Sequence, residues 1–321
     1  MKLQPILLSP AFRHGASTPW GGSLLKEIYH KNIPDDHTGE SLEMSVIPGL
    51  PSIDSSGKTL EERIAEHPAA MVGTDVSGDF PLLLKLIDAQ DRLSVQVHPD
   101  DAYAKAHENK LGKTEAWVIL KAREGAQLVY GVKAGTTYES LKEASERGEG
   151  VEDLLRFVPV HAGEVFYIPS GMVHAIGAGI MLYEIQQSSD VTYRFYDWNR
   201  TDAQGNRRAL HIQQALDVTR LDLQPDAAEP VQIPDPRCRR EQLLDTPFFS
   251  LQRLHDCRDV PFDAQLTHFS VLTALEPGVL HLENGKKEIR FPAGQTIYIP
   301  ADCEQFTLSC PLCLLSAPVH K

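Results

Sequence analysis

Two histidines and one glutamate in this sequence have the residue types of a metal site. His98 lies in LSVQVHPDD, Glu115 begins an apolar run after LGKT, and His174 follows AGEVFYIPSGMV. Two imidazoles and one carboxylate leave a coordination position open for water or substrate, as a catalytic zinc site requires. Gln96 can add a fourth contact through its side-chain oxygen. The same donor set suits non-haem iron, so the ligand types alone do not choose the metal.

Strand alternation places further polar side chains beside these ligands, because alternate residues of a strand share a face. In the first stretch Ser94, Gln96 and His98 share a face. In the second stretch Lys113 and Glu115 share a face. A solvent-facing surface and a weak surface ion pair are the ordinary interpretations of such groups. The apolar strands that flank both stretches favour the alternative, an interior site.

The segment VTYRFYDWNR supplies positive charge. Arg194 shares a strand face with Thr192 and Tyr196, and Arg200 follows just beyond the strand. An arginine among aromatic residues is often a packed and paired cation. The chain has a net charge of −13, so an anion such as phosphate requires a local basic pocket. Lys113, Arg194 and Arg200 near one metal ion would form that pocket.

The elements that position these residues are expected to be mainly strands. Short β-type runs separated by Pro, Gly, Asn and Asp predict a β core with a few helices. The expected strands are residues 81–88, 92–99, 114–122, 126–132, 164–169, 180–187 and 191–198. The expected helices are residues 23–31, 59–67, 100–109, 137–148, 151–157 and 211–220.

Two stretches of similar pattern, residues 162–177 and 293–308, indicate two related barrels. Both read Ala-Gly, then an apolar strand that ends Tyr-Ile-Pro, then a short turn. A strand followed by a turn with a histidine can deliver a ligand to the mouth of a small antiparallel barrel, or cupin. The position of His174 in the first copy is held by Gln305 in the second. The second barrel is therefore expected to bind no metal and to act as a packing unit.

The length of 321 residues also favours two packed units. We expect two cupin-like, jelly-roll barrels with a few short helices. Residues 1–223 would form the catalytic metal-binding cupin domain with its helical segments. Residues 224–237, which are rich in Pro and Asp, would be a linker, and residues 238–321 would form a degenerate cupin-like β domain.

Composition excludes several classes of partner. The acidic charge argues against nucleic acid and against anionic membranes. The first residues lack the pattern of a signal peptide, and no stretch approaches the roughly 18 apolar residues of a membrane helix. All 5 cysteines lie in the C-terminal part, and this odd number indicates reduced thiols and a cytoplasmic protein. The number of subunits is left open.

Several of these stretches resemble one known family, the type I mannose-6-phosphate isomerases, particularly their short bacterial form. The resemblance rests on LSVQVHPDD, LGKTEAW, AGEVFYIPSGMVHAIG and YEIQQSSDVTYRFYDWNR, in this order and spacing. It runs from GESLEMS near the N-terminus to about Arg220, and the C-terminal part matches in pattern only. It implies a cupin enzyme with one zinc ion per chain that interconverts mannose 6-phosphate and fructose 6-phosphate in carbohydrate metabolism.

The resemblance also implies roles for individual residues. The family's zinc ligands fall on Gln96, His98, Glu115 and His174, its active-site arginine on Arg194, and its substrate-pocket positions on Ser94, Lys113 and Glu184.

Some positions depart from the family pattern. Leu42 stands where a tryptophan is usual. Ile176 stands where longer eukaryotic members have tyrosine, so the pocket there is expected to differ in shape. Those members end the arginine motif with Thr-Pro-Lys, where this chain has Trp198, Asn199 and Arg200. Arg200 can supply the cation of that lysine.

Aldose–ketose isomerisation moves a proton between C1 and C2 through an enediol whose oxygens carry negative charge. Zinc as a Lewis acid and Arg194 can stabilise that charge. The candidate bases are Lys113, Glu184 and a zinc-bound water. The phosphate would rest on the remaining cations and orient the distant reacting carbons.

Three alternative functions remain open. An isomerase of unphosphorylated mannose would use the same motifs. An iron cupin oxygenase is disfavoured by the cations that suit a phosphate. A non-catalytic sugar-phosphate-binding cupin is disfavoured by the complete ligand set together with Arg194.

Overall fold

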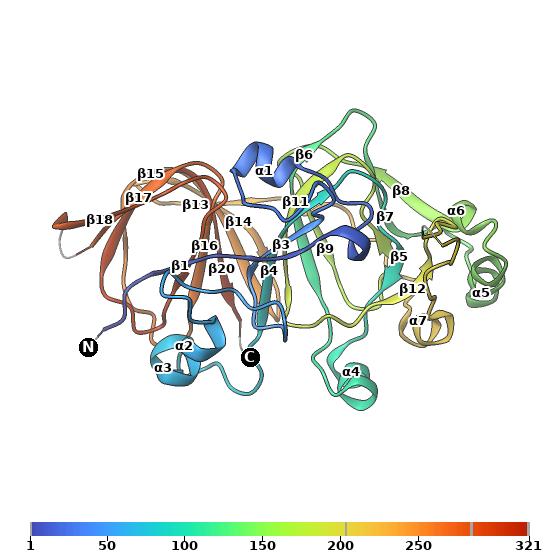
Figure 1. Cartoon of the computed structure of the whole chain (residues 1–321), viewed down its shortest axis with the longest axis horizontal. Coiled ribbons are helices and arrows are strands. Elements are labelled where there is room, and N and C mark those ends of the chain that lie inside the picture. The colour runs from blue at the N-terminus through green and yellow to red at the C-terminus, as the bar shows by residue number, and fades with distance from the viewer. Residues whose placement is uncertain (1, 203, 283–284, 320–321) are drawn as a thin grey trace.

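The computed structural model describes residues 2–202, 204–282 and 285–319, and it has two β lobes that lie side by side (Figure 1). Strands dominate both lobes, and the helices are few and short. The predicted mainly β fold class is therefore confirmed.

Two sheets form the first barrel, a six-stranded sheet of order β2-β3-β4-β11-β6-β9 and a five-stranded sheet of order β12-β5-β10-β7-β8. Their strands are β2 (Ala11–Arg13), β3 (Glu40–Met44), β4 (Leu82–Ala89), β5 (Val95–Val97), β6 (Glu115–Ala122), β7 (Gln127–Val132), β8 (Leu155–Pro159), β9 (Val165–Ile168), β10 (His174–Ala175), β11 (Ile180–Gln187) and β12 (Tyr193–Tyr196). One apolar cluster takes Ile87 and Trp117 from the first sheet and Tyr130 from the second. The sheets thus pack face to face, as in a jelly roll.

A single nine-stranded sheet, curled on itself, forms the second lobe. Its strands are β1 (Ile6–Leu8), β13 (Val231–Ile233), β14 (Arg239–Asp245), β15 (Phe249–Phe262), β16 (Ser270–Ala274), β17 (Gly278–Leu282), β18 (Lys287–Phe291), β19 (Thr296–Ile299) and β20 (Phe306–Pro318). The main order is β1-β19-β16-β20-β15-β14-β13, and β17 pairs with both β18 and β20. Apolar side chains and cysteine thiols fill its interior.

The two lobes share one pattern of strand connections. The path β4-β11-β6-β9 of the first lobe corresponds to β15-β20-β16-β19 of the second, and the corresponding strands follow one another in the same sequence order. The two copies of the sequence repeat contain β9 and β19, which occupy matching places in these paths. This correspondence supports the expectation of two related barrels.

The sheet of the first barrel that holds β4, β6 and β11 packs its outer face against the second lobe. Leu84 and Tyr183 belong to the same buried cluster as Phe249, Val271 and Leu314. The Tyr183 hydroxyl lies 2.8 Å from the hydroxyl of Ser316 across this boundary. Since the neighbours Lys85 and Glu184 point the opposite way along their strands, the second lobe supports the back of the sheet whose inner face carries them.

The division of the chain into domains stays a prediction, and the structure adds two details to it. The first strand, β1, pairs with β19 of the second lobe, with Leu7 opposite Ile297. The segment expected as a linker, residues 224–237, contains β13, which pairs with β14.

The helices lie at the ends and edges of the barrels (Figure 1). They are α1 (Leu24–Tyr29), α2 (Leu60–Glu66), α3 (Pro68–Val72), α4 (Asp101–Glu108), α5 (Tyr138–Arg147), α6 (Val151–Leu154), α7 (Ile212–Val218) and the 3₁₀ turn η1 (Gly15–Ser17). The helix expected at residues 151–157 is wrong in its second half. The chain becomes strand β8 at Leu155, because pairing with β7, Phe157 opposite Val129, replaces the local helical preference.

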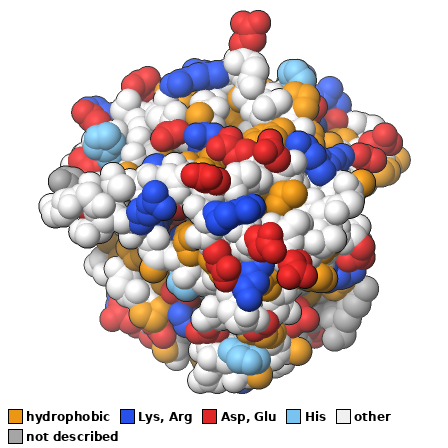
Figure 2. All heavy atoms as spheres, turned by 90° about the vertical axis from the view of Figure 1, so that its right-hand side faces the viewer, with side chains coloured by type: hydrophobic (Ala, Val, Ile, Leu, Met, Phe, Trp, Pro, Cys, Tyr) orange, Lys and Arg blue, Asp and Glu red, His pale blue; other side chains and the backbone are white. Residues whose placement is uncertain are grey.

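One end of the molecule has a surface of mixed charge. Acidic and basic side chains are intermingled over the end of the molecule that carries α5–α7 (Figure 2). Among the residues that the structure describes, no helix has the length and apolar character needed to span a membrane. An anionic ligand must therefore be attracted by a local cavity.

Removal of residues 238–321 is expected to leave most of the chain insoluble, because the apolar back of the β4–β6–β11 sheet would face water. The soluble fraction after expression measures this. Gln305→Ala is the matched point variant: the Gln305 side chain is exposed and donates to Asp263 at 2.9 Å. It is expected to keep wild-type solubility, zinc content and kcat. A soluble, folded truncated chain, or a Gln305→Ala variant without turnover, would contradict this role of the second lobe.

Candidate active site

The two histidines and the glutamate of the predicted metal site meet inside the first barrel. His98 directly follows β5, Glu115 opens β6, and His174 opens β10. β10 pairs with β5, with His174 opposite Gln96, which brings the two histidine segments together. One donor atom from each of the three residues lies within 4.8 Å of the others, and all three side chains are buried. The spacing in the sequence thus becomes a single cluster of donors.

The imidazole rings are oriented by backbone carbonyls. Nδ1 of His98 donates to the carbonyl of Val191 at 2.9 Å, and Nδ1 of His174 donates to the carbonyl of Met172 at 2.8 Å. Each Nε2 atom is thereby turned towards Glu115, at 3.7 Å for His98 and 3.3 Å for His174. Metal-binding histidines are usually oriented in this manner through their second nitrogen.

The protonation states also suit a metal ion. Burial lowers the pKa of His174 to about 4. Burial, and next the Lys113 ammonium, hold the pKa of His98 well below its ordinary value. Both rings are therefore neutral at pH 7 and offer a lone pair.

The carboxylate of Glu115 has an oxygen without a hydrogen-bond partner. This atom, Oε1, is buried, while Oε2 accepts a hydrogen bond from Lys113 at 2.5 Å. Burial, and next the charge of Glu184, raise the pKa of Glu115 to about 7. One oxygen of this buried carboxylate and two neutral imidazoles therefore face one another without a hydrogen-bond donor or a cation between them. A divalent cation would fill that place, so the residues present fit a metal ion.

Gln96 lies at the edge of the cluster. Its Nε2 is 3.4 Å from Nε2 of His174, and its Oε1 accepts a hydrogen bond from the Ser94 hydroxyl at 3.2 Å. A half-turn of the amide would exchange these two atoms, and a hydroxyl can donate to one and accept from the other. Gln96 can therefore present its oxygen to an ion held by the other three residues.

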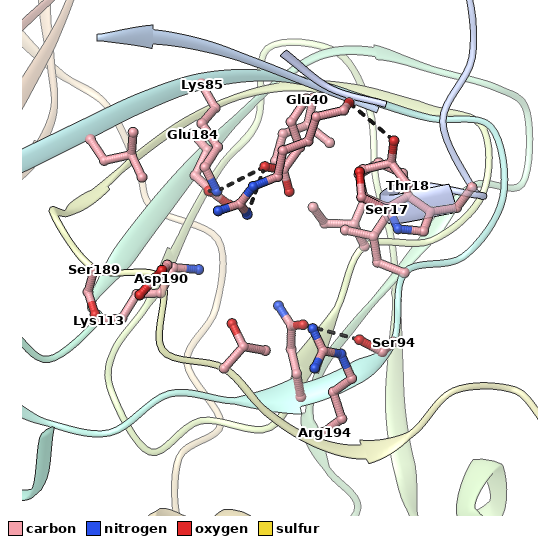
Figure 3. A pocket seen from close by; sticks show the side chains of 18 of the residues that line it. Ser17, Thr18, Glu40, Lys85, Ser94, Lys113, Glu184, Ser189, Asp190 and Arg194 are labelled. Carbon is pink, nitrogen blue, oxygen red and sulfur yellow. Dashed lines mark hydrogen bonds and ion pairs between the residues drawn. The ribbon is translucent and has the colours of Figure 1, made fainter. Parts of the chain in front are cut away.

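A cavity of about 220 Å³ opens beside this cluster. Figure 3 shows it between Lys85 and Glu184 on one side and Arg194 and Ser94 on the other. Glu184 accepts from Lys85 through Oε1 at 3.0 Å and from the Trp117 indole through Oε2 at 2.8 Å. Burial alone would raise the pKa of Glu184, but Lys85, Lys113 and these hydrogen bonds lower it to about 2. Glu184 is thus a fixed carboxylate.

Comparison with known proteins identifies relatives of this chain. Residues 10–122 match the family model "Phosphomannose isomerase type I, catalytic domain". The mannose-6-phosphate isomerase of Streptococcus mutans is 44% identical over 238 residues, which cover 73% of this chain and 74% of the relative. The mannose-6-phosphate isomerase ManA of Bacillus subtilis is 42% identical over 231 residues, covering 70% of this chain and 71% of the relative.

The chain belongs to the type I phosphomannose isomerase family. Its fold agrees over almost the whole length with the crystal structure of the Bacillus subtilis mannose 6-phosphate isomerase. The TM-score is 0.88 at 32% identity, and the match covers 98% of this chain and 99% of the other. The C-terminal lobe, where the sequence resembled the family only in pattern, is therefore part of the shared fold. Membership of this family confirms the predicted enzyme class, an aldose–ketose isomerase.

Most of the positions that the resemblance to the type I phosphomannose isomerases selected lie in the wall of the cavity, on both of its sides (Figure 3). They are Ser94, Gln96, Lys113, Glu184 and Arg194, and Ile176 joins them. Nε of Arg194 is buried without a hydrogen-bond partner. His98, Glu115 and His174 lie next to this wall, linked to it through Lys113, whose Nζ is 3.0 Å from Nε2 of His98.

Arg200 differs from its predicted position. It does not line the cavity. Its guanidinium instead binds the Asp197 carboxylate and donates to the carbonyl of Arg92 at 2.6 Å. The cause is local: Trp198 and Asn199 have φ of 57° and 52°, and these left-handed residues turn the chain back on itself after β12. The cation expected at the end of the arginine motif is thereby directed away from the pocket.

Other lining residues were not predicted as part of the site. Lys85 lies within the apolar run PLLLKLID, and a lysine in a strand that is otherwise apolar was the available signal. Arg13 and Glu40 come from β2 and β3 and pair with each other at 3.3 Å. Arg208 comes from the segment before α7. No local pattern marks these last three residues, because the fold alone brings their segments to the cavity.

Proposed function

We propose that this chain interconverts mannose 6-phosphate and fructose 6-phosphate at a zinc ion held by His98, Glu115 and His174, with Gln96 as a further ligand. The observation that carries the proposal is the convergence of three buried donors beside a cavity lined by cations. The named activity of the Streptococcus and Bacillus relatives supports the choice of substrate. The donor set, two imidazoles with one carboxylate, fits zinc and iron alike, and the resemblance to the type I phosphomannose isomerases supports zinc.

When bound, zinc supplies a Lewis acid for the sugar oxygens that gain negative charge in an enediol. Lys113 now contacts both His98 and Glu115, at 3.0 and 2.5 Å. A zinc ion held by these ligands would repel the Lys113 ammonium, so Lys113 would lose these two contacts. Lys113 would still line the cavity next to the metal ligands.

The proton transfer between C1 and C2 is assigned to Lys113 rather than to Glu184: as a neutral amine Lys113 would take the proton from one carbon, and as the resulting ammonium it would return the proton to the other. Glu184 has both oxygens engaged by Lys85 and Trp117, and its pKa of about 2 makes it a weak base at neutral pH. Lys113 lies directly beside the metal ligands and lines the cavity. Glu184 instead holds Lys85 in place at the cavity wall through their ion pair.

Arg194 is assigned the role of stabilising the negative charge that develops on the sugar oxygens. It lies opposite Gln96 in the β12–β5 pair, and no carboxylate among the described residues forms an ion pair with it. A guanidinium without a permanent partner is available to an oxyanion. Ser94 holds the Gln96 amide and so completes the metal side of the pocket.

Two further assignments complete the proposal. The second lobe acts as a vestigial cupin that supports the catalytic barrel, as its matching strand path and shared core indicate. A cytoplasmic location is supported by the cysteines, all of which are free thiols.

A coupled assay of purified, zinc-loaded protein with mannose 6-phosphate and with free mannose tests the function. We expect turnover of the phosphorylated sugar with a kcat/KM at least about 100-fold above that of free mannose, the scale of a charge-assisted interaction lost with the phosphate. Equal kcat/KM values would favour the isomerase of unphosphorylated mannose. Oxygen consumption by the iron-loaded protein would favour the iron cupin oxygenase. Binding of the sugar phosphate without turnover would favour the non-catalytic binding protein.

A further inference from the structure

The cavity wall contains more positive charge than its own carboxylates neutralise. Each carboxylate on the wall already pairs with a lysine or arginine. The pairs are Glu40 with Arg13, Glu184 with Lys85, and Asp190 with Lys110, at 3.3, 3.0 and 2.5 Å. Arg194 and Arg208 line the same cavity, and in the part of the chain that the structure describes neither forms an ion pair. Two guanidiniums are thus left for an anion that enters from solvent.

The two arginines occupy different depths. Arg194 is partly buried on β12 beside the metal-binding Gln96. Arg208 is exposed, and within residues 2–202, 204–282 and 285–319 its one hydrogen bond is a long one, 3.4 Å, to the carbonyl of Ser17 in η1. Both guanidiniums line the cavity, and like charges that share a cavity repel each other. Such repulsion is relieved when an anion lies between them.

We propose that Arg208 binds the substrate's phosphate at the cavity mouth and is the residue that selects phosphorylated over free sugar. The inference rests on the proposed function, whose site it extends. It assigns to Arg208 the cationic role that the sequence had suggested for Arg200, whose guanidinium is held by Asp197 instead.

The length of the substrate agrees with this placement. In a hexose 6-phosphate the reacting carbons C1 and C2 and the phosphate lie at opposite ends. His98, Glu115 and His174 are buried below the cavity, with exposed fractions of 1, 0 and 0%, whereas Arg208 is exposed at the opening. The sugar therefore enters with C1 first and leaves its dianionic phosphate near Arg208, while Arg194 lies towards the reacting end, opposite Gln96.

Arg208→Ala in the zinc-loaded enzyme tests the proposal, with Arg207→Ala as the matched control. Arg207 is the adjacent arginine of the same exposed segment, it does not line the cavity, and its guanidinium lies beside Gly148. Arg208→Ala is expected to raise KM for mannose 6-phosphate on the order of 10- to 100-fold, with a much smaller change in kcat. The preference for mannose 6-phosphate over mannose should fall by a similar factor. Arg208→Lys should recover part of the loss.

A binding measurement separates this proposal from the isomerase function itself. Calorimetric titration of the zinc-loaded proteins with inorganic phosphate should show binding that weakens on the order of 10-fold or more in Arg208→Ala and not in Arg207→Ala. A wild-type protein that binds phosphate through Arg208 without turning over either sugar would contradict the isomerase function and leave the phosphate site in place. Equal phosphate affinity and equal KM in both alanine variants, or a loss confined to kcat in Arg208→Ala, would overturn the assignment.

Discussion

His174→Ala is expected to abolish both zinc binding and turnover. The side chain supplies one of the three converging donors, and its Nδ1 is fixed by the Met172 carbonyl so that Nε2 points at Glu115. Without it, the ion would have one imidazole, one carboxylate and the neutral amide of Gln96, too weak a set to hold zinc. Loss of a Lewis acid worth several kcal/mol should lower kcat by on the order of 10³-fold or more. Metal analysis and a coupled assay on the same preparation measure both effects.

His161→Ala is the control for this substitution. His161 is also a histidine paired with a glutamate, Glu164 at 3.4 Å, but its side chain is 77% exposed and is not part of the donor cluster. It should keep about one zinc per chain and wild-type kcat. A His174→Ala protein that is folded by circular dichroism and retains both zinc and turnover would remove His174 from the site.

Arg194→Ala is expected to lower kcat by roughly 10²-fold or more while the zinc content stays unchanged. Arg194 lies opposite Gln96, so its guanidinium is near the reacting end of the sugar, and its buried Nε has no partner in the described residues. A cation there stabilises the negative charge of the enediol more than that of the substrate. Among the described residues, the Arg194 side chain has no hydrogen bond or ion pair with His98, Glu115 or His174, so the ion should remain.

The distribution of the effect between kcat and KM decides the role of Arg194. The Arg207→Ala variant, which removes an arginine outside the cavity, controls for net charge. A rise in KM at constant kcat would make Arg194 a ground-state binder of the phosphate and would contradict its assignment to the developing charge. Comparison with Arg208→Ala distinguishes the two arginines: the loss in Arg194→Ala should fall on kcat, and the loss in Arg208→Ala on KM.

The donor cluster could be predicted from the sequence because each donor is set by local structure. Alternation along a strand places Gln96 and His98 on one face, and the turn after the Tyr-Ile-Pro strand carries His174. The predicted strands at 81–88, 114–122 and 180–187 agree with β4, β6 and β11 to within a residue at each end. Thr59 and Gly148 likewise mark the ends of α2 and α5 as the capping rules require.

The rest of the cavity could not be predicted, because it depends on contacts between distant segments. Arg13 and Arg208 are nearly two hundred positions apart in the printed sequence, yet both line one cavity. The direction of Arg200 depends on two left-handed residues whose types, Trp198 and Asn199, do not require that conformation. The pairing of β1 with the second lobe is equally non-local.

The dependence of activity on bound zinc tests the central claim most directly. The purified protein should be stripped with a chelator, titrated with zinc, and assayed with mannose 6-phosphate at each step. Turnover should be absent in the stripped protein, rise in proportion to the zinc bound, and saturate at about one zinc per chain, the number of ions that one cluster of His98, Glu115 and His174 can hold. Full turnover by metal-free protein would contradict a metal-dependent isomerase at this site.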